Sequence, residues 1–235
     1  MTCKKRMGLI AAIELDAILE HYENLKEIDA PPGFKVFLVE RDTYDIYIIR
    51  SGMGLVAASC GVQYLAAKYD VSCIINFGVV GGLSEDMKKQ KICLVDRVVH
   101  YKYDCSEFMD LEVGQVDGHD SIYLKPSEKL VEIAGSVMEG LSLATCCSGD
   151  KFVATEEEKK LIRDKFDGDI CDMESAGIVL ASEANGIPCL LLKAVSDGLA
   201  DGAEGFYAEL QSASLKCLIA ADTIMEQVAK MDDTM

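Results

Sequence analysis

The sequence is poor in the residue types that build metal sites and disulfide frameworks. It contains three histidines, and its ten cysteines include no Cys-x-x-Cys pair. Most of these cysteines lie in apolar runs, where a buried free thiol behaves as a small hydrophobic side chain. We therefore expect neither a zinc site nor a disulfide framework. We also expect no metal and no organic cofactor.

Positive charge is also scarce. The chain has 23 lysines and arginines against 40 aspartates and glutamates, which gives a formal net charge of −17 at pH 7. A surface this acidic repels nucleic-acid phosphates and anionic membranes, so we expect no binding to nucleic acid or to a membrane. A small neutral or cationic ligand is compatible with this charge.

Long apolar runs are missing as well. No run approaches the ~20 residues that a membrane-spanning helix needs. The apolar stretch at residues 7–13 follows Lys and Arg residues and loosely mimics a signal peptide. However, Glu14 and Asp16 end it, and no small-residue cleavage site follows. We therefore expect a cytoplasmic protein without a membrane span.

The sequence does contain enough apolar material for a sizeable core, since 50% of its residues are hydrophobic. Short apolar runs alternate with amphipathic helical patterns, and several runs are apolar at every position, as buried strands are. Strands are expected at residues 8–13, 45–50, 72–76, 92–99, 141–146 and 189–196, and helices at 130–141, 175–185 and 217–228. This alternation, without a linker or repeat, predicts a single α/β domain over residues 1–235. Its central sheet should be mixed, mainly parallel and flanked by helices.

Acidic residues and glycines gather where the predicted strands end. In open α/β sheets, ligands bind outside the carboxyl ends of the strands. Asp16, Glu174 and Asp197 lie at three such ends, and a glycine-rich turn at residues 78–82 follows another. Each acid alone is explained as the cap of a helix or turn. Their common placement around one glycine-rich turn indicates a ligand site.

The glycine-rich segments carry no nucleotide-binding fingerprint. Residues 51–54 and 78–82 lack the G-x-G-x-x-G spacing of dinucleotide sites, and the chain has no G-K-[ST] sequence of a phosphate-binding P-loop. Glycine also permits a tight turn and a close approach of the backbone to a ligand. Both segments therefore suggest close approach of the backbone to a ligand, and neither alone is a specific signal.

Several segments, in chain order, carry a resemblance to a known family. They are Gly8-Leu-Ile-Ala-Ala-Ile-Glu-Leu-Asp16, Ser51-Gly-Met-Gly54, Ile74-Ile-Asn-Phe-Gly-Val-Val-Gly-Gly82, Ser148-Gly-Asp150, Asp172-Met-Glu-Ser-Ala176 and Lys193-Ala-Val-Ser-Asp197. From Gly8 to about Val228, the chain resembles the nucleoside phosphorylase/nucleosidase family, most closely its methylthioadenosine/S-adenosylhomocysteine nucleosidases. The resemblance implies hydrolysis of the N-glycosidic bond of a purine nucleoside. The implied substrate is methylthioadenosine, S-adenosylhomocysteine or both, with release of adenine and the thioribose in methionine salvage.

The resemblance also implies roles around the base and the ribose. Asp197 matches the acid that protonates or hydrogen-bonds the imidazole ring of the base, where a donor helps because negative charge collects on the leaving purine. Glu174 matches the residue that grips the ribose hydroxyls, and Met173 matches the residue packed under the sugar. Phe152 and Val153 match the residues that stack on the base and bind its edge through backbone groups.

Further site residues follow from the same resemblance. The apolar pocket around the thioalkyl substituent is matched by Ile13, Met53 and Phe206, and other substrate-binding positions are matched by Val80, Gly81, Asp172 and Ser196. The resemblance implies a homodimer in which Phe108 or Met109 completes the pocket of a neighbouring subunit, as in the homodimeric family members. The apolar helix face with Val56 and Cys60 agrees with this, although such a face also suits a buried core.

Three positions depart from the family pattern. Asp16 stands where the nucleosidases usually carry Glu, and we expect it to activate the attacking water despite its shorter side chain. Glu14, two residues away, is expected to point to the other face of an extended segment. Val79 stands where the family often has Ser, which removes one polar contact to the water. Lys193 stands where some members have Arg, whose guanidinium offers a fixed fork of donors.

Two other functions are compatible with this fold. A phosphorolytic purine nucleoside phosphorylase would need arginines to hold phosphate. Residues 11–17 contain acids and no arginine, which favours hydrolysis. A non-catalytic nucleoside-binding module would tolerate the changes at Asp16 and Val79. The presence of Asp197, Glu174 and Met173 together favours an enzyme.

Overall fold

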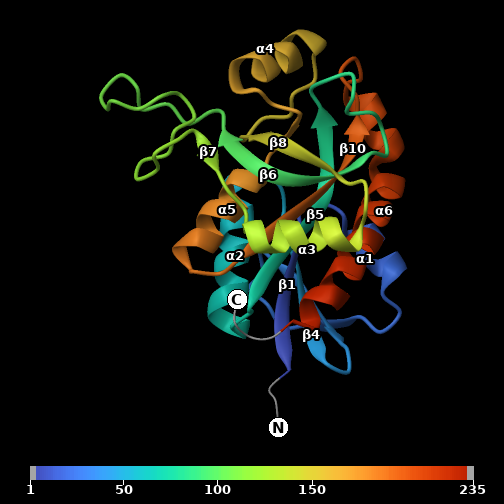
Figure 1. The fold of residues 1–235 in the computed structure, drawn as a ribbon. Helices are drawn as coiled ribbons and strands as arrows, with labels where there is room; N and C mark the ends of the chain where they lie inside the picture. The colour runs from blue at the N-terminus through green and yellow to red at the C-terminus, as the bar shows by residue number, and fades with distance from the viewer. Residues whose placement is uncertain (1–3, 232–235) are drawn as a thin grey trace.

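The computed structural model describes residues 4–231. Its strands are β1 (Lys5–Ala11), β2 (Lys26–Ile28), β3 (Lys35–Glu40), β4 (Tyr44–Arg50), β5 (Cys73–Gly82), β6 (Ile92–His100), β7 (Tyr123–Leu124), β8 (Ser142–Ser148), β9 (Ile170–Asp172) and β10 (Cys189–Asp197). Its helices are α1 (Leu15–His21), α2 (Leu55–Tyr69), α3 (Glu128–Val137), α4 (Glu156–Phe166), α5 (Ser175–Ala184) and α6 (Ala203–Ala229). Strands and helices alternate along most of the chain (Figure 1), as the hydrophobic patterns predict.

The strands form one mixed sheet. Their order is β10-β6-β8-β9-β5-β1-β4-β3-β2, with β7 paired to β6. A further pairing of β10 with β5 closes β5, β9, β8, β6 and β10 into a ring, and β1, β4, β3 and β2 continue the sheet to one side. The ladders that join β10, β5, β1 and β4 are parallel, whereas β2, β3 and β7 pair antiparallel with their neighbours. The predicted fold class, α/β with a mixed sheet flanked by helices, is confirmed.

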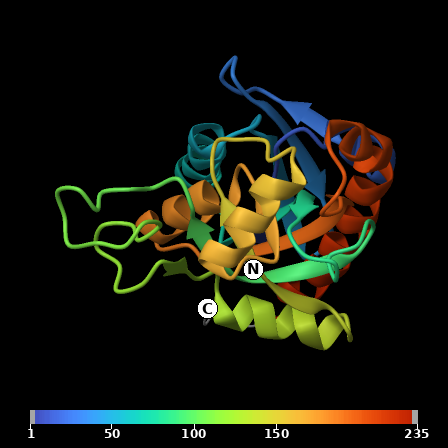
Figure 2. The same cartoon turned by 90° about the horizontal axis from the view of Figure 1, so that it is seen from above.

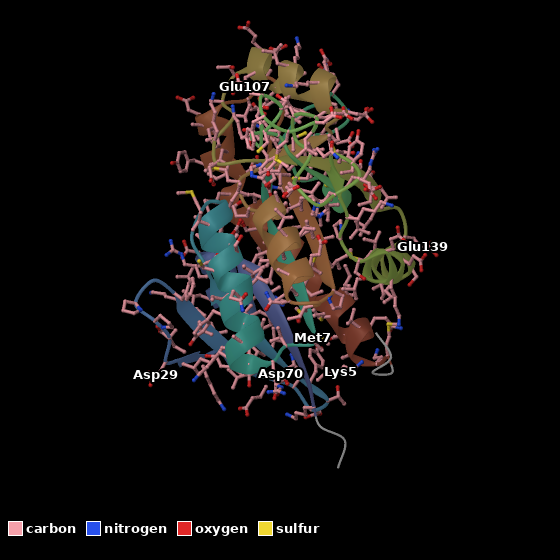
Figure 3. All side chains as sticks on the ribbon, turned by 90° about the vertical axis from the view of Figure 1, so that its left-hand side faces the viewer. Lys5, Met7, Asp29, Asp70, Glu107 and Glu139 are labelled. Atoms are coloured by element: carbon pink, nitrogen blue, oxygen red, sulfur yellow. The ribbon has the colours of Figure 1, made fainter. Side chains whose placement is uncertain are left out.

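Two hydrophobic cores cover the two faces of the sheet. On one face, α6 packs with α1 and α3 over Leu9, Ile75 and Leu192. On the other face, α2 and α5 pack over Ile10 and Ile74. Successive residues of β1 and β5 therefore enter opposite cores, which explains why these strands are apolar at nearly every position. Figure 3 shows α2 (teal) and α5 (orange) side by side on the second face.

One end of the molecule carries the irregular segments. α4 lies at this end (Figure 1 and Figure 2), where Ile162 and Phe166 pack with Val99 in a third, smaller core. Residues 101–122, between β6 and β7, project from the body as the green loop of Figure 1. Glu107 marks this loop in Figure 3, at the end of the molecule opposite Asp70. The segment between β6 and β7 is therefore a projecting loop.

β5 is longer than the sequence predicts. The hydrophobic pattern indicates a strand that ends at Asn76 and a glycine-rich turn after it, whereas β5 continues to Gly82. Residues Gly78 to Gly81 pair with β10, and Gly81 and Gly82 pair with β9. Pairing with β10, joined by pairing with β9 at Gly81 and Gly82, keeps this stretch extended, although glycine is unfavourable inside a strand. The prediction of a turn after Asn76 is therefore wrong.

The sequence also predicts the absence of a membrane span, of disulfides and of a metal site. No helix within residues 4–231 is long and apolar enough to cross a membrane. Within the same range the cysteines are free thiols, and no group of three or more His, Cys, Asp or Glu side chains is placed to hold a metal ion. The ends of the predicted 1–235 domain, residues 1–3 and 232–235, lie outside the described residues.

Candidate active site

A cavity lies where β1, β5, β9 and β10 end. Separate segments of the chain form its wall: Ala12, Ile13, Glu14, Met53, Val79, Val80, Gly81, Lys151, Phe152, Val153, Cys171, Asp172, Met173, Glu174, Asp197 and Phe206. Most of the site residues expected from the sequence therefore meet in one place. Asp16, Lys193 and Ser196 lie outside this wall.

The carboxylate beside β1 comes from Glu14. This side chain is buried, and its Oε2 accepts hydrogen bonds from the backbone N–H groups of Ala12 and Ile13, both at 2.9 Å. Its Oε1 accepts a third hydrogen bond from the N–H of Val79 at 3.2 Å. The three backbone donors hold the Glu14 carboxylate at the wall of the cavity.

The prediction that Asp16 faces the cavity is wrong. Asp16 lies in the first turn of α1 and is exposed to solvent. The segment is not extended, because Glu14 has φ −78° and ψ 32° at the start of the helix. Residues two positions apart in a helix point in directions about 200° apart around its axis. Only one of the two acids, Glu14 or Asp16, can therefore face the cavity. The acid that faces the cavity is therefore a glutamate, the residue that the nucleosidases usually carry at this position.

Asp197, at the end of β10, forms a buried ion pair with Lys159. Its side chain is 2% exposed, and the fully buried Nζ of Lys159 in α4 donates to its Oδ2 at 2.6 Å. The Ser196 hydroxyl donates to its Oδ1 at 2.9 Å, so Ser196 acts on the site through Asp197. Burial raises the pKa of Asp197, and the hydrogen bonds from Lys159 and Ser196 hold this rise back. A carboxyl with a raised pKa can keep a proton for donation.

A second buried ion pair lies beneath the cavity, between Asp172 and Lys193. The Nζ of Lys193 is 2.8 Å from Oδ2 of Asp172, and both side chains are almost completely buried. Burial alone would raise the pKa of Asp172, but Lys193 and the Ser175 hydroxyl hold it below its usual range. Burial would lower the pKa of Lys193, but the Asp172 carboxylate raises it above its usual value. Both groups are therefore charged, and Lys193 supports the floor of the cavity from outside its wall.

Glu174 links this ion pair to the start of α2. It lies at the N-cap of α5, and one carboxylate oxygen accepts a hydrogen bond from the N–H of Gly54 at 2.8 Å. Gly54 has φ +97°, a conformation that favours glycine. Burial and the nearby charge of Asp172 raise the pKa of Glu174 to about 7, against the opposing effect of Lys193. Glu174 therefore changes its protonation state near neutral pH.

Two glycines of β5 make room for the two carboxylates. A Cβ atom at Gly78 would lie 3.1 Å from Oε1 of Glu14. A Cβ atom at Gly81 would lie 3.2 Å from Oδ2 of Asp197. Any side chain at either position would press against a carboxylate. The glycine-rich sequence is therefore explained by the close approach of Glu14 and Asp197 to the strand, and not by a turn.

Apolar side chains form part of the cavity wall. Ile13, Met53 and Phe206, which the family resemblance implies for the apolar pocket, line it together with Phe152. The rings of Phe152 and Phe206 meet edge to face with their centroids 5.5 Å apart, and Met53 and Phe152 are partly open to solvent. An apolar substituent on a ligand can pack against this surface.

The residues expected at a subunit interface lie on the outside of the molecule. Phe108 is 77% exposed, and neither Phe108 nor Met109 lines the cavity of its own chain. Val56 is 74% exposed, and Cys60 on the same helix is exposed as well. The other side of α2, which includes Val62, is buried in the core. The alternative that Val56 and Cys60 belong to the core is therefore wrong.

Several site residues were not predicted from the sequence: Ala12, Glu14, Lys151 and Cys171 in the wall, and Lys159 behind it. A signal for Lys159 is nevertheless present. Lys159, Ile162 and Phe166 are the buried residues of α4 and follow the spacing of one helix face. A lysine on the apolar face of an otherwise charged helix indicates a buried partner.

Comparison with known proteins shows the family of this chain. A family model described as the Phosphorylase superfamily matches residues 7–229. The chain belongs to the phosphorylase superfamily. It is similar to the 5'-methylthioadenosine/S-adenosylhomocysteine nucleosidase of Hydrogenovibrio crunogenus, with 29% identity over 200 residues, 82% of this chain and 85% of that protein. It is also similar to the aminodeoxyfutalosine nucleosidase of Campylobacter jejuni, with 25% identity over 222 residues, 93% of this chain and 95% of that protein.

Solved structures share the fold of this superfamily member. The native futalosine hydrolase of Helicobacter pylori strain 26695 matches with a TM-score of 0.89 at 23% identity, covering 95% of this chain and 98% of that one. At this identity the likeness shows the fold alone. The two relatives above are nucleosidases, which are N-glycosyl hydrolases, and the enzyme class expected from the sequence is confirmed.

Proposed function

We propose that this chain hydrolyses the N-glycosidic bond of methylthioadenosine, S-adenosylhomocysteine or both, and releases adenine and the thioribose. The observation that carries the proposal is a pair of carboxyl groups in one cavity, Glu14 beside β1 and Asp197 at the end of β10. One is proposed to act on the attacking water and the other on the leaving base. These two proton transfers need no metal and no organic cofactor.

Asp197 is the proposed acid. When the bond between the ribose and the base breaks, its electrons pass to the purine. A proton donated to the imidazole ring then lowers the barrier, typically by ~10²–10⁴-fold in rate. Burial raises the pKa of Asp197, which favours the protonated form that this step requires. Phe152 and Val153, on the same wall, are proposed to stack on the base and to bind its edge.

Glu14 is the proposed base. Bond cleavage gives an oxocarbenium-like ribose, and water attacks its anomeric carbon while one proton of the water passes to Glu14. The negative charge of Glu14 also stabilises the positive charge that develops on the sugar. Glu174 is proposed to accept hydrogen bonds from the ribose hydroxyls, with Met173 packed under the sugar. Glu14 returns its proton to solvent, and Asp197 takes one up before the next cycle.

The charge of the cavity wall favours hydrolysis over phosphorolysis. A phosphate nucleophile would have to approach the Glu14 carboxylate, which repels a dianion. Phosphate sites are usually built from guanidinium groups that bind two oxygens at once. Among the described residues, the wall includes one cationic side chain, Lys151, and its Nζ pairs with Glu158 at 2.6 Å.

One relative supports a second candidate substrate, aminodeoxyfutalosine. The Campylobacter jejuni nucleosidase named for it is similar over 93% of this chain. The apolar wall formed by Ile13, Met53 and Phe206 can pack against apolar substituents of different shapes. The two candidates share the same cleavage chemistry and differ in the substituent at this wall.

The experiment that tests the proposal measures base release from a panel of nucleosides with and without phosphate. Adenine release from methylthioadenosine or S-adenosylhomocysteine should be independent of phosphate. It should exceed release from adenosine by about tenfold or more in kcat/KM, because the apolar wall contributes only when the substituent is present. Faster cleavage of aminodeoxyfutalosine would identify the second candidate. Dependence on phosphate would indicate a phosphorylase, and no release from any member would indicate a non-catalytic binding protein.

We further propose that the chain acts in methionine salvage in the cytoplasm, as a homodimer. A single copy of the chain exposes several large apolar side chains to solvent, among them Met53, Val56 and Phe108. Exposed apolar surface often marks an interaction site. Phe108 or Met109 of a second copy would complete the pocket for the thioalkyl group. Sedimentation at micromolar concentration should give the mass of a dimer, and a monomer would contradict this proposal.

A further inference from the structure

Lys159 is a buried lysine that takes no part in the two proposed proton transfers. It projects from α4, and its side chain is fully buried. Its Nζ donates to Oδ2 of Asp197 at 2.6 Å, to the carbonyl oxygen of Gly198 at 2.7 Å and to the carbonyl oxygen of Asp201 at 3.2 Å. The three protons of the ammonium therefore have three acceptors, and all belong to the end of β10 or to the loop after it.

Stability alone is a weak explanation for this arrangement. Moving two charges out of water costs several kcal/mol per ion, and a well-packed apolar pair is often as stable as a buried ion pair. The surface of α4 carries another lysine, Lys160, which pairs with Glu156 while partly exposed. Lys159, in contrast, delivers its charge to the one carboxyl of the cavity that is proposed to donate a proton.

We propose that Lys159 is a positioning residue that sets the acidity of Asp197 during hydrolysis of the N-glycosidic bond. This inference rests on the proposed function. The ammonium holds Oδ2 of Asp197 and stabilises the carboxylate that remains when the proton of Asp197 passes to the base. The electrons of the broken glycosidic bond go to the purine, and Lys159 keeps its own three protons throughout. Without the ammonium, a carboxyl in this buried position would hold its proton too tightly to donate it well.

The other groups that face Asp197 cannot supply this charge. Cys171 of β9 is a buried thiol whose pKa is raised by burial to about 12. Ser196 donates one neutral hydrogen bond. Asp201, in the loop after β10, is negative and opposes ionisation of Asp197, and Lys89 pairs with Asp201, at 3.2 Å. Lys159 is thus the cation that contacts the proposed acid directly.

The test compares the pH dependence of kcat in variants that remove or keep the charge. A general acid must be protonated, so activity falls as pH rises through its pKa. In Lys159→Met, the pKa of Asp197 should rise, and the high-pH fall in kcat should move upward by about one pH unit or more. The plateau kcat should drop by about tenfold, because the remaining acid is weaker. Lys159→Arg keeps the charge, and its high-pH fall should stay near the wild-type position.

Two further variants separate charge from packing. Lys159→Gln removes the charge but keeps a polar side chain with an N–H donor, so it should show the same upward shift as Lys159→Met. It carries the test if the methionine variant fails to fold, as judged by thermal unfolding. Lys160→Met, on the exposed side of α4, is the matched control and should keep the wild-type profile.

The outcomes distinguish failure of this inference from failure of the proposed function. If the charge-removing variants fold and their high-pH fall stays at the wild-type position, Lys159 is merely structural and the inference is wrong. That conclusion requires a wild-type chain that hydrolyses its nucleoside and loses activity on Asp197→Asn. A wild-type chain that releases no base from any nucleoside refutes the proposed function itself.

Discussion

The two carboxyl groups of the cavity are held in different ways. Glu14 receives three hydrogen bonds from backbone N–H groups, two from its own segment and one from β5. Asp197 is held by side chains, with Lys159 at 2.6 Å and Ser196 at 2.9 Å. Backbone donors are placed by the fold and carry no net charge, whereas an ammonium adds a full charge beside the carboxyl. The fold thus orients the proposed base, while a single side chain controls the acidity of the proposed acid.

The largest effect is expected from Asp197→Asn, which keeps the shape of the side chain and removes its acidic proton. kcat should fall by ~10²-fold or more, with a smaller change in KM, because the lost contact is made mainly in the transition state. A purine nucleoside methylated at the imidazole ring needs no protonation of its base. The variant should cleave this substrate at close to the wild-type rate. Steady-state kinetics measure both, and equal losses on the two substrates would contradict the role of Asp197 as an acid.

Glu14→Gln tests the role of Glu14 as the proposed base. It should lower kcat by ~10²-fold, because the amide cannot accept a proton from water. The methylated substrate should not rescue it, since the defect lies in the nucleophile. Asp16→Asn and Asp16→Glu are the matched controls. Asp16 is exposed, so both should stay within about twofold of wild type. A large loss in the Asp16 variants with normal activity in Glu14→Gln would reverse the assignment.

Gly78→Ala perturbs Glu14 without changing its chemistry. The added Cβ would lie 3.1 Å from Oε1 of Glu14 and 3.8 Å from Nζ of Lys193, so the carboxylate has to move by a few tenths of an ångström. We expect kcat to fall by about tenfold, since displacement of a reacting group by ~1 Å can cost ~10²-fold. Gly33→Ala, where a Cβ meets nothing within 4 Å, should leave kcat unchanged. Unchanged kcat in Gly78→Ala would show that the position of Glu14 matters little.

The smallest effect concerns the pH dependence of ribose binding by Glu174. Its pKa is raised to about 7 by burial and by the charge of Asp172. The ionised carboxylate accepts hydrogen bonds more strongly, so KM should rise by roughly threefold to tenfold as pH falls below about 7. Glu174→Gln should have a KM that is nearly independent of pH between 6 and 8, to within about twofold. A wild-type KM that does not change over this range would contradict the proposed contact.

The same raised pKa affects the free energy of unfolding. The folded-state pKa of Glu174, about 7, lies above its ordinary value of 4.5. Its contribution to stability is therefore fully present below pH 4.5 and is lost as pH rises through 7. The difference in unfolding free energy between Glu174→Gln and wild type should shift in favour of the variant over that window. Denaturant unfolding at several pH values measures it.

The sequence predicts the fold class because strands that are buried on both faces appear in it as continuous apolar runs. Each predicted strand corresponds to a strand of the structure, and β4 and β10 agree with the prediction to within one residue at either end. The continuation of β5 to Gly82 was missed, because glycine has low strand propensity and only pairing with β9 and β10 keeps it extended. α4 was also missed, since a run of charged residues gives little apolar periodicity.

The sequence by itself determined that the chain forms buried strands with acids and glycines at their ends, because these patterns depend on neighbours in the chain. Only the tertiary structure decided which acid faces the cavity. Glu14 and Asp16 are both carboxylates near the end of β1, and the helical start of α1 turns the former inward. Only the tertiary structure also brought Lys159 to Asp197, 38 residues away along the chain. Contacts of this kind depend on how α4 packs against the sheet, and no local pattern of residues specifies that placement.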